Sequence, residues 1–574
     1  MGWPYRFVTL SQDETDLRRQ TIDRYAGLAQ LSAFVPVLLF LGYRLASWAY
    51  AAVEAKKGAY NAIPESPLRK VRRQGPLGVW ESRYRHLQWW LGDDVVFLGR
   101  TWGQRDEWVF GLAWGLWMAA LTVAGTHDDY LHLTKRAGAI GISQLPLQYL
   151  LALKSLNPVA YIFNSSHEQV NRYHRVLGRI IYTLLLVHAL LYLNFFVASG
   201  ILVEKLTTSR AVKTGMVGIW GLTLLNTTTL RFIRTYSYRI FFIVHLVVAM
   251  IIPPLIWFHA HHPRVFLVEA LVVFLADIIT RKFDTFTAVA KLEMVPNTNL
   301  VKITAPVPNK KIHRFVTHPG SHIYLQIPAE ARPSDSAASA GHIVHEFLYN
   351  PFTVADVDPE SGNLTLVARH LNGPMTTSLN QIASNNSRHD STKIPLSIEG
   401  PYGVAGHLKA LVEGEFDRIL LVAGGVGATY TVPLYRALVK DNAAAQVQLV
   451  WAVRDVGDAS WVTSGKNGQG FTEDEGVQVF VTAPEDKSPV AQGPGDEDDG
   501  VELTPLQRSG EVRHQLMRPN MKKIVDEVFQ HGQDERVAVF FCGPTAMGRD
   551  LRNHVGVWVR KGRVVFWHSE SFGW

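Results

Sequence analysis

At 574 residues the chain is long enough for more than one domain, and its 57 Lys and Arg exceed its 50 Asp and Glu. Charged residues make up 19% of it, below the roughly 25% of an average soluble protein. The basic residues gather in short clusters beside apolar runs, which suits membrane anchoring and argues against a nucleic-acid-binding domain. The single cysteine, Cys542, excludes an intrachain disulfide and a cysteine-ligated zinc or iron–sulfur site.

The apolar segments lie in the N-terminal half of the chain. A bilayer core about 30 Å thick needs roughly 20 apolar residues of helix. Seven stretches are candidates for such a helix: 27–50, 107–125, 137–154, 173–197, 214–231, 238–259 and 264–281. The third is the weakest candidate, because it contains polar residues. The first stretch follows a polar segment, as a retained membrane helix does and a cleaved signal peptide does not.

Clusters of Lys and Arg between these stretches predict how the chain is oriented, because cytosolic loops carry an excess of such residues. The clusters fall in alternate loops, at residues 69–73, 172–175, 231–239 and 281–282, although smaller groups at 135–136 and 205–213 reduce the contrast. We therefore expect an integral membrane protein with about seven spans in contact with lipid. Its N-terminus lies outside and its large C-terminal half lies in the cytosol.

Four histidines form two pairs with one spacing. His174 and His188 are 14 residues apart, and His245 and His259 repeat that interval. On a helix, 14 residues turn through about 1400°, about 40° short of four circles, and rise about 21 Å, so the members of a pair share a face. Both helices run outward in the predicted topology, which places His174 level with His245 and His188 level with His259. One histidine from each helix at each of two depths suits two stacked bis-histidine haems.

Other roles exist for membrane histidines. A single one is more often a structural hydrogen-bonding residue or part of a polar cavity. Intramembrane ionisable groups are rare and usually functional, and four of them with repeated spacing and matched depths favour metal ligation. A metal or proton channel also uses such histidines, but it does not need the module that follows.

From about residue 291 the pattern changes to short alternating strands, which predicts an antiparallel barrel over 285–410. An aromatic residue can contact a flavin ring, a threonine its polar edge and an arginine its pyrophosphate. The candidates in this region are His322, then Pro351, Phe352 and Thr353, then Arg369 with Gly373, Met375 and Thr376. Pro-Phe-Thr taken alone is equally the start of a strand.

A second domain, over 411–574, carries nucleotide-binding signals. A buried strand at 418–423 leads into a loop that opens a helix and contains Gly424, Gly425, Gly427, Ala428 and Thr429. Glycines let the backbone approach a pyrophosphate, and a helix N-terminus favours the anion. This loop departs from a regular GxGxxG, and a glycine loop alone is a weak signal.

Further candidates follow the later strands of this domain. Arg454 ends a strand at 447–453, and a cation there suits the 2′-phosphate of NADPH, although adjacent Asp455 leaves NADH open. Cys542 ends another strand, where open α/β sheets bind ligands, unless it is an inert buried thiol. The acidic stretch 483–513 predicts a disordered insertion. The remaining candidates are Gly543, Pro544, Glu570, Phe572 and Trp574, whose terminal ring could cover the flavin.

In this order, over roughly 137–574, these motifs resemble the ferric reductases of fungi, relatives of the NADPH oxidases. The resemblance implies a membrane haem core (131–284) after an outer segment (1–26) and extra helices (27–130), then an FAD barrel and a nucleotide domain of the ferredoxin-reductase type. It implies that the four histidines ligate two b-type haems. The family usually has His before Pro-Phe-Thr, whereas this chain has Asn350, which puts the flavin contact there in question.

The predicted function is electron transfer from cytosolic NADPH through FAD and two b-type haems to Fe(III) or Cu(II) outside. That makes the chain a ferric-chelate reductase for iron uptake in the plasma membrane, with Cys542 and Trp574 as its catalytic candidates. An outer cation could dock at residues from two loops, unless these are ordinary polar residues: His127, Asp128, Asp129, His132, His259, His261 and His262. The alternatives are a superoxide-generating NADPH oxidase and a non-enzymatic membrane protein with degenerate reductase domains.

Overall fold

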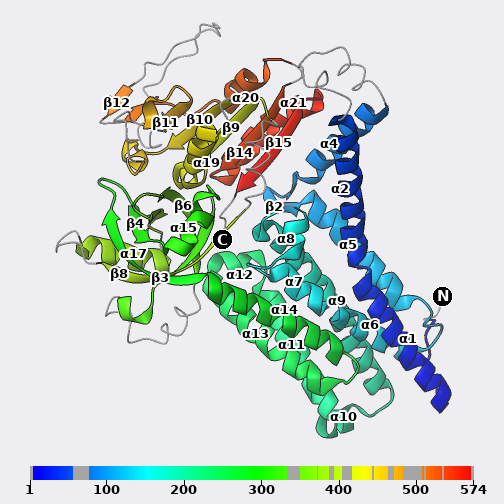
Figure 1. The fold of residues 1–574 in the computed structure, drawn as a ribbon. Coiled ribbons are helices and arrows are strands. Elements are labelled where there is room, and N and C mark those ends of the chain that lie inside the picture. The colour runs from blue at the N-terminus through cyan, green and yellow to red at the C-terminus, as the bar shows by residue number, and fades with distance from the viewer. Residues whose placement is uncertain are drawn as a thin grey trace, which may run out of the picture. The chain divides into compact units, whose positions relative to one another are not determined.

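The computed structural model describes residues 4–55, 76–163, 165–332, 349–371, 373–386, 393–403, 416–441, 445–462, 471–482, 507–509, 512–532 and 535–570. These residues belong to two compact units (Figure 1). Unit 1 contains residues 1–59 and 90–281, and unit 2 contains residues 60–89 and 282–573.

Unit 1 is helical apart from a short hairpin of β1 and β2. Two long apolar helices, α9 (His167–Ala198) and α13 (Tyr238–His259), carry the histidine pairs. The other elements are α1 (Gln12–Leu31), α2 (Phe34–Ala55), β1 (Asp94–Phe97), β2 (Arg100–Gln104), α5 (Arg105–Val123), α6 (Tyr130–Ser143), α7 (Leu145–Ala152), α8 (Pro158–Ile162), α10 (Leu202–Thr208), α11 (Arg210–Thr228), α12 (Arg231–Tyr236) and α14 (Arg264–Asp284).

The third expected span is divided into two helices, α6 and α7. Pro146 lies in the first turn of α7, where its missing N–H costs no helical hydrogen bond, and Gln144 separates the two helices. Both helices pack against α9, and α11 packs along α13. Leu145, Leu177 and Ile181 belong to the apolar core between them.

Among the described residues of unit 1, three helical segments are long and apolar enough to cross a membrane: Gln12–Ala49, His167–Ala198 and Tyr238–His259. The first extends through α1 and α2 and so begins earlier than the expected span at 27–50. The other four expected stretches coincide with α5, with α6 and α7, with α11 and with α14, and the count of seven spans stays a prediction. Large apolar side chains such as Trp220, 70% exposed, cover the outside of these helices, as a lipid environment allows.

Unit 2 contains a closed antiparallel barrel, as predicted. Its strands follow each other around the barrel in the order β3-β4-β7-β6-β5-β8. Alternate apolar residues such as Leu292, Ile303 and Leu366 fill its interior, and α17 (Pro374–Asn386) packs against β3. The strands are β3 (Thr285–Met294), β4 (Leu300–Pro306), β5 (His322–Gln326), β6 (Asn350–Asp358), β7 (Asn363–Arg369) and β8 (Ile394–Tyr402).

The second part of unit 2 is a parallel sheet with helices on both faces. Its strand order is β11-β10-β9-β14-β15. In β9, Leu421 packs with α19 (Ala428–Asp441) on one face, whereas Leu420 packs with α20 (Met521–Phe529) and α21 (Thr545–Arg560) on the other. The strands are β9 (Arg418–Gly424), β10 (Gln446–Val453), β11 (Val477–Val481), β14 (Arg536–Cys542) and β15 (Val564–Glu570).

The prediction of disorder over 483–513 is wrong at its C-terminal end. There β12 (Gln507–Ser509) and β13 (Val512–His514) pair in an antiparallel sheet. The acidic composition that suggested disorder is confined to residues before this hairpin, and backbone pairing does not depend on it. Residues 483–506 lie outside the described residues.

Unit 2 also contains a segment from far earlier in the chain, the first part of α4 (Pro76–Leu91). The guanidinium of Arg552 lies 4.2 Å from the centre of the Trp89 ring, and its Nη2 donates to the Trp89 carbonyl at 2.9 Å. The ring of Trp567 meets Trp89 edge-on at 5.9 Å. At Gly556, an added Cβ would lie 3.0 Å from Nε1 of Trp89. The absence of a side chain at this position therefore lets the Trp89 ring pack against α21.

We expect Trp89→Ala to lower the unfolding free energy of unit 2 by about 1–3 kcal/mol, because a half-buried ring with a cation–π contact is lost. Thermal melting of the detergent-purified chain, followed by tryptophan fluorescence, measures the change. Trp80→Ala removes a ring from the same helix that is 73% exposed and should shift the melting temperature little. Equal shifts for the two variants would contradict the docking of Trp89.

Candidate functional site

The two histidine pairs meet as the spacing predicts. The ring centres of His174 and His245 are 6.1 Å apart, and those of His188 and His259 are 6.2 Å apart. His174 precedes His188 in α9 as His245 precedes His259 in α13, so these two helices run parallel. The pairs are separated by 14 residues of helix, about 21 Å of rise.

These separations match two imidazoles on one metal. A metal–imidazole bond is about 2 Å long, and the nitrogen lies roughly 1.1 Å from the ring centre, so two rings opposite each other on one metal have centres about 6.2 Å apart. Two rings in direct packing contact need not stand at this distance at both depths. The side chains present therefore fit two metal centres, each held between α9 and α13.

Three of the four rings are oriented by hydrogen bonds to backbone carbonyls. Nδ1 of His188 lies 2.7 Å from the Thr134 oxygen, Nδ1 of His259 lies 2.7 Å from the Ala211 oxygen, and Nδ1 of His174 lies 2.9 Å from the Gln148 oxygen. An imidazole that donates from Nδ1 presents the lone pair of Nε2 to a metal.

The inner pair, His174 and His245, differs from the outer pair. Nδ1 of His245 is buried and has no hydrogen-bond partner within the described part of the chain. Nε2 of Gln148 donates to the His174 carbonyl at 3.1 Å and lies 3.3 Å from Nε2 of His174. A polar amide therefore lies beside Nε2 of His174 at this depth.

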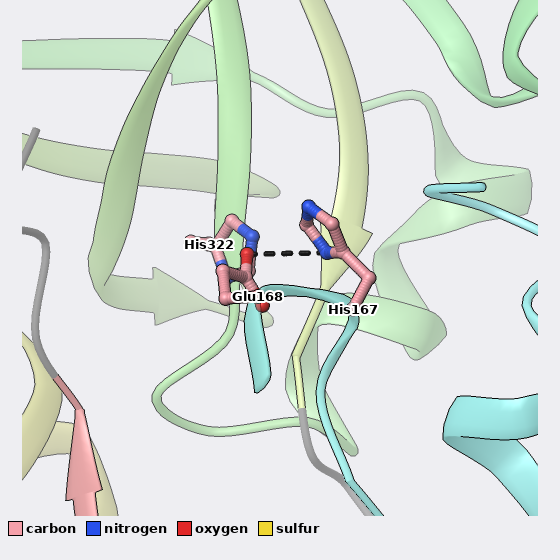
Figure 2. Close-up of side chains that lie close together, drawn as sticks. All are labelled: His167, Glu168 and His322. Atoms are coloured by element: carbon pink, nitrogen blue, oxygen red, sulfur yellow. Dashed lines mark ion pairs between the residues drawn. The ribbon is translucent and has the colours of Figure 1, made fainter. Parts of the chain in front are cut away.

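The start of α9 is well defined, and it determines the depth of both its histidines. Ser166 caps the helix by accepting a hydrogen bond from the Gln169 N–H. In the first turn, Nδ1 of His167 lies 3.1 Å from Oε1 of Glu168 (Figure 2), and an acid at this end suits the helix dipole. Because the helix rises by a constant amount per residue, this start fixes the positions of His174 and His188 along the axis of α9.

The outer-loop residues do not gather as a cation site in the described part of the chain. His132 is 7% exposed and lies 2.7 Å from Arg136, and Asp129 caps α6 and pairs with Arg18 at 3.0 Å. His262 pairs with Asp23 at 3.1 Å. The burial of His132 therefore favours the alternative that it is an ordinary polar residue and not part of a cation-docking site.

The flavin candidates lie on adjoining strands and a helix start of the barrel. In the register of β5 and β6, His322 (also drawn in Figure 2) stands opposite Thr353, and Ile323 stands opposite Phe352. Pro351 stands opposite Tyr324. Met375 and Thr376 lie in the first turn of α17, just after Gly373, and the helix N-terminus there is a site that favours an anion.

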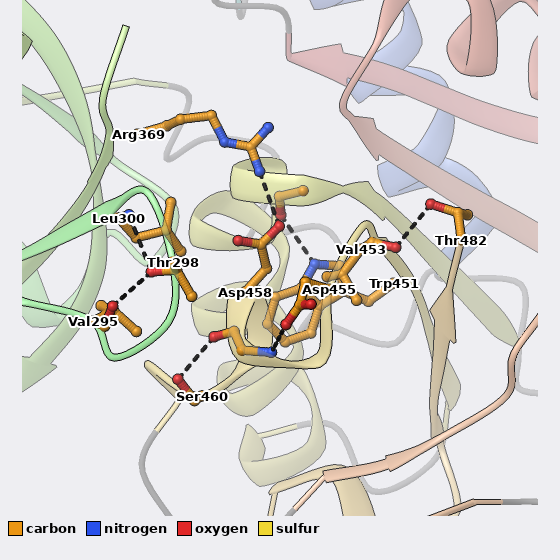
Figure 3. A network of polar contacts seen from close by, with 12 residues as sticks. Val295, Thr298, Leu300, Arg369, Trp451, Val453, Asp455, Asp458, Ser460 and Thr482 are labelled. Carbon is orange, nitrogen blue, oxygen red and sulfur yellow. Dashed lines mark hydrogen bonds and ion pairs between the residues drawn. The ribbon is translucent and has the colours of Figure 1, made fainter. Parts of the chain in front are cut away.

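Arg369 extends from the end of β7 toward the glycine loop of the nucleotide domain. Its Nη2 pairs with Asp458 at 3.1 Å (Figure 3), and its guanidinium lies 3.6 Å from the position of an added Cβ at Gly425. The indole of Trp451 donates to the Gly425 carbonyl at 3.0 Å and holds the loop from the other side. Nothing in the sequence marks Asp458 as the partner of this arginine.

The glycine loop lies at the point where the order of the parallel sheet reverses. The chain adds β10 and β11 on one side of β9, and β14 and β15 on the other. Open α/β sheets bind ligands in the crevice at such a point. The carboxyl ends of β9 and β14 carry the glycine loop and Cys542 with Gly543 and Pro544.

Backbones approach closely at this crevice. An added Cβ at Gly427 would lie 2.0 Å from the Cys542 carbonyl oxygen, and one at Gly424 would lie 2.4 Å from Cδ of Pro544. An added Cβ at Gly543 would lie 2.8 Å from the Gly424 nitrogen. The glycines therefore bring the loop after β9 against the turn after β14. Ala428 and Thr429, both buried, open α19 from this loop.

Cys542 and Glu570 occupy neighbouring strand ends. They stand opposite each other in the register of β14 and β15, and both are at least nine-tenths buried. Burial, and then the carboxylate of Glu570, raise the pKa of the Cys542 thiol. Nε2 of His568 lies 2.9 Å from Oε2 of Glu570. Phe572 and Trp574 lie outside the described residues.

Arg454 is exposed at the end of β10, as expected for a residue that meets a ligand in solution. The adjacent carboxylate has another partner, since Oδ1 of Asp455 accepts the Gly457 N–H at 2.8 Å (Figure 3). A carboxylate that already accepts this backbone hydrogen bond is less available to accept one from a ribose hydroxyl. This arrangement favours the arginine as the ligand contact.

Family comparisons agree with this arrangement of domains. A model of the ferric reductase like transmembrane component matches residues 137–256, an FAD-binding domain matches 285–406, and a ferric reductase NAD binding domain matches 416–556. The chain thus has the domains of a membrane oxidoreductase, a ferric reductase like transmembrane domain followed by FAD- and NAD-binding domains.

It belongs to the ferric reductase family, which confirms the resemblance seen in its motifs. A probable metalloreductase AIM14 of Meyerozyma guilliermondii is 24% identical over 79% of this chain and 86% of its own length. Ferric/cupric reductase transmembrane component 2 of Schizosaccharomyces pombe is 25% identical over 56% of this chain and 61% of its own length. Ferric/cupric reductase transmembrane component 2 of Saccharomyces cerevisiae is 23% identical over 74% of this chain and 58% of its own length. The chain thus spans about three fifths of the length of these two ferric/cupric reductases.

We expect iodoacetamide to label Cys542 at pH 7.5 at least 100-fold more slowly in the native chain than in the chain unfolded in guanidinium. A raised pKa keeps the thiol protonated, and burial blocks the reagent. Cys542 is the only cysteine, so the mass of the whole chain reports its labelling. Equal rates in the native and unfolded chains would show that the thiol is accessible and ionised.

Proposed function

We propose that the chain transfers electrons from cytosolic NADPH, through FAD and two b-type haems, to ferric chelates on the opposite side of the membrane. The observation that carries the proposal is the pair of imidazole couples at two depths, with ring centres 6.1 and 6.2 Å apart. Cupric ions are an allied substrate, since two relatives are named ferric/cupric reductases. A role in iron uptake at the plasma membrane follows from this activity.

Bound FAD would convert a two-electron transfer from the nicotinamide into single electrons, and bound haems would carry those electrons across the membrane. On this proposal Arg369, Gly373 and Thr376 hold the FAD pyrophosphate, and Phe352 and Thr353 contact its ring. The Arg369–Asp458 ion pair would have to open for a phosphate to take the place of the carboxylate.

The glycine loop from Gly424 to Thr429 would hold the nucleotide pyrophosphate, and Arg454 would hold the 2′-phosphate. Cys542 lies at the end of β14 as a buried neutral thiol and would support the floor of the nicotinamide site, since a protonated thiol is a poor nucleophile. Gly543 and Pro544 would shape the floor of this crevice, with Glu570 and His568 behind it.

His174 with His245 would hold one haem, and His188 with His259 would hold the other. The bound haems would supply one-electron transfer to the acceptor. Oxygen would accept an electron in the same way, so the acceptor is identified by measurement of its reduced product.

The test uses inside-out membrane vesicles with NADPH outside and ferric chelate trapped within. The proposal expects ferrous chelate in the lumen and little superoxide. Ferrous chelate formed only on the NADPH side, a dominant superoxide product, or purified protein without a b-type haem spectrum would each overturn it.

We expect His188→Ala to remove about half of the b-type haem and to lower lumenal ferric reduction at least 100-fold. The outer centre loses one of its two ligands, whereas His174 and His245 stay intact. Reduced-minus-oxidised spectra and the vesicle assay measure both effects. His313→Ala, in exposed α15 (Asn309–Val316), is the matched control and should retain all of the haem. Full haem content in His188→Ala would contradict the assignment of this ligand.

We expect Arg454→Ala to raise the KM for NADPH on the order of tenfold and to leave the KM for NADH unchanged. A charge-assisted hydrogen bond to phosphate contributes about 1.5–3 kcal/mol, less at an exposed site. Flavin reduction by each nucleotide in the purified chain measures the two constants. Lys440→Ala, which removes an exposed cation at the end of α19, is the control. An equal change for both nucleotides would rule out recognition of the 2′-phosphate by Arg454.

A further inference from the structure

The outer histidines share a feature that the inner histidines lack. His188 donates to the carbonyl of Thr134 in α6, and His259 donates to the carbonyl of Ala211 in α11. In each helix a glycine follows the accepting residue by four positions, Gly138 in α6 and Gly215 in α11. At the inner pair, His174 donates to Gln148, and the residue four positions later is Ala152.

The four-residue interval has a direct physical meaning. Side chains on a helix tilt toward its N-terminus, so the side chain of residue i+4 lies over the carbonyl of residue i. That carbonyl already accepts the N–H of residue i+4 and keeps a second lone pair for another donor. An imidazole can use this lone pair only where residue i+4 leaves room beside it.

Both glycines leave that room for an imidazole ring. An added Cβ at Gly138 would lie 2.6 Å from Nδ1 and 2.8 Å from Cε1 of His188. An added Cβ at Gly215 would lie 2.7 Å from Cε1 and 2.9 Å from Nδ1 of His259. Glycines on two different helices thus lie against the same two ring atoms, Nδ1 and Cε1.

We propose that Gly138 and Gly215 are positioning residues for the outer haem: their missing side chains let His188 and His259 bond to the carbonyl one turn earlier and so present Nε2 to iron. This proposal rests on the proposed function. Loss of such a supporting bond typically lowers metal affinity 10–100-fold. An alanine at either position would displace the ring and weaken the outer centre alone.

Small residues also serve helix packing in membranes, and this is the competing role for both glycines. The chain offers a matched control in Gly218, which is buried on α11 three positions after Gly215 and where an added Cβ meets nothing within 4 Å. Gly218→Ala adds the same methyl group to the same helix away from any histidine.

The experiment compares Gly138→Ala, Gly215→Ala and Gly218→Ala in the purified full-length chain. Haem content relative to FAD and the low-spin ferric electron paramagnetic resonance spectrum are the readouts. We expect the first two variants to lose or shift the outer-haem signal, with the inner signal unchanged, and Gly218→Ala to match the parent. Two unaltered haem signals in Gly138→Ala and Gly215→Ala would overturn the proposal.

A double variant keeps the proposal testable if Gly138→Ala does not accumulate. If the glycine acts through His188, Gly138→Ala combined with His188→Ala should accumulate and bind haem as His188→Ala does alone. A double variant that is worse than His188→Ala would assign Gly138 to helix packing and overturn the proposal. A parent chain without b-type haem would refute the proposed function itself, whereas two haems that are insensitive to both glycines would refute only the inference.

Discussion

The parallel alignment of α9 and α13 is the constraint on which the membrane unit depends. Because each helix repeats the same interval of 14 residues, alignment of one histidine pair aligns the other. A slip of one turn, about 5.4 Å, would separate both pairs at once. The neighbouring helices α6, α7 and α11 supply the carbonyls that orient three of the rings. The orientation of these rings therefore depends on how these three helices pack against α9 and α13.

Unit 2 depends on a different contact, the approach of two backbones at the switch point of its sheet. Three glycines remove the side chains that would separate the loop after β9 from the turn after β14. Cys542 lies in this contact, which explains why its thiol is buried and protonated. Its position fits a residue that shapes a crevice, and its chemistry does not fit a nucleophile.

The sequence was sufficient for the histidine pairs, because a helix converts a residue interval into a face and a rise. It was also sufficient for the barrel strands and the glycine loop, where alternation and local composition carry the signal. It was not sufficient for the acceptors of the imidazole hydrogen bonds, since the carbonyls of Thr134 and Ala211 have no side-chain signature. It also left open whether His132 docks a cation, because burial beside Arg136 depends on how the helices pack and not on the local sequence.

The placement of Trp89 bears on how the reductase half can be isolated. The FAD-binding match begins at residue 285, and a fragment cut there would contain both binding domains and omit the helix that covers α21. Such a fragment would expose the indole of Trp567 and the aliphatic part of the Arg552 side chain to water, and an exposed apolar surface favours self-association. A soluble reductase made from this chain would therefore need residues 76–89 restored, by fusion through a short linker or as a separate peptide.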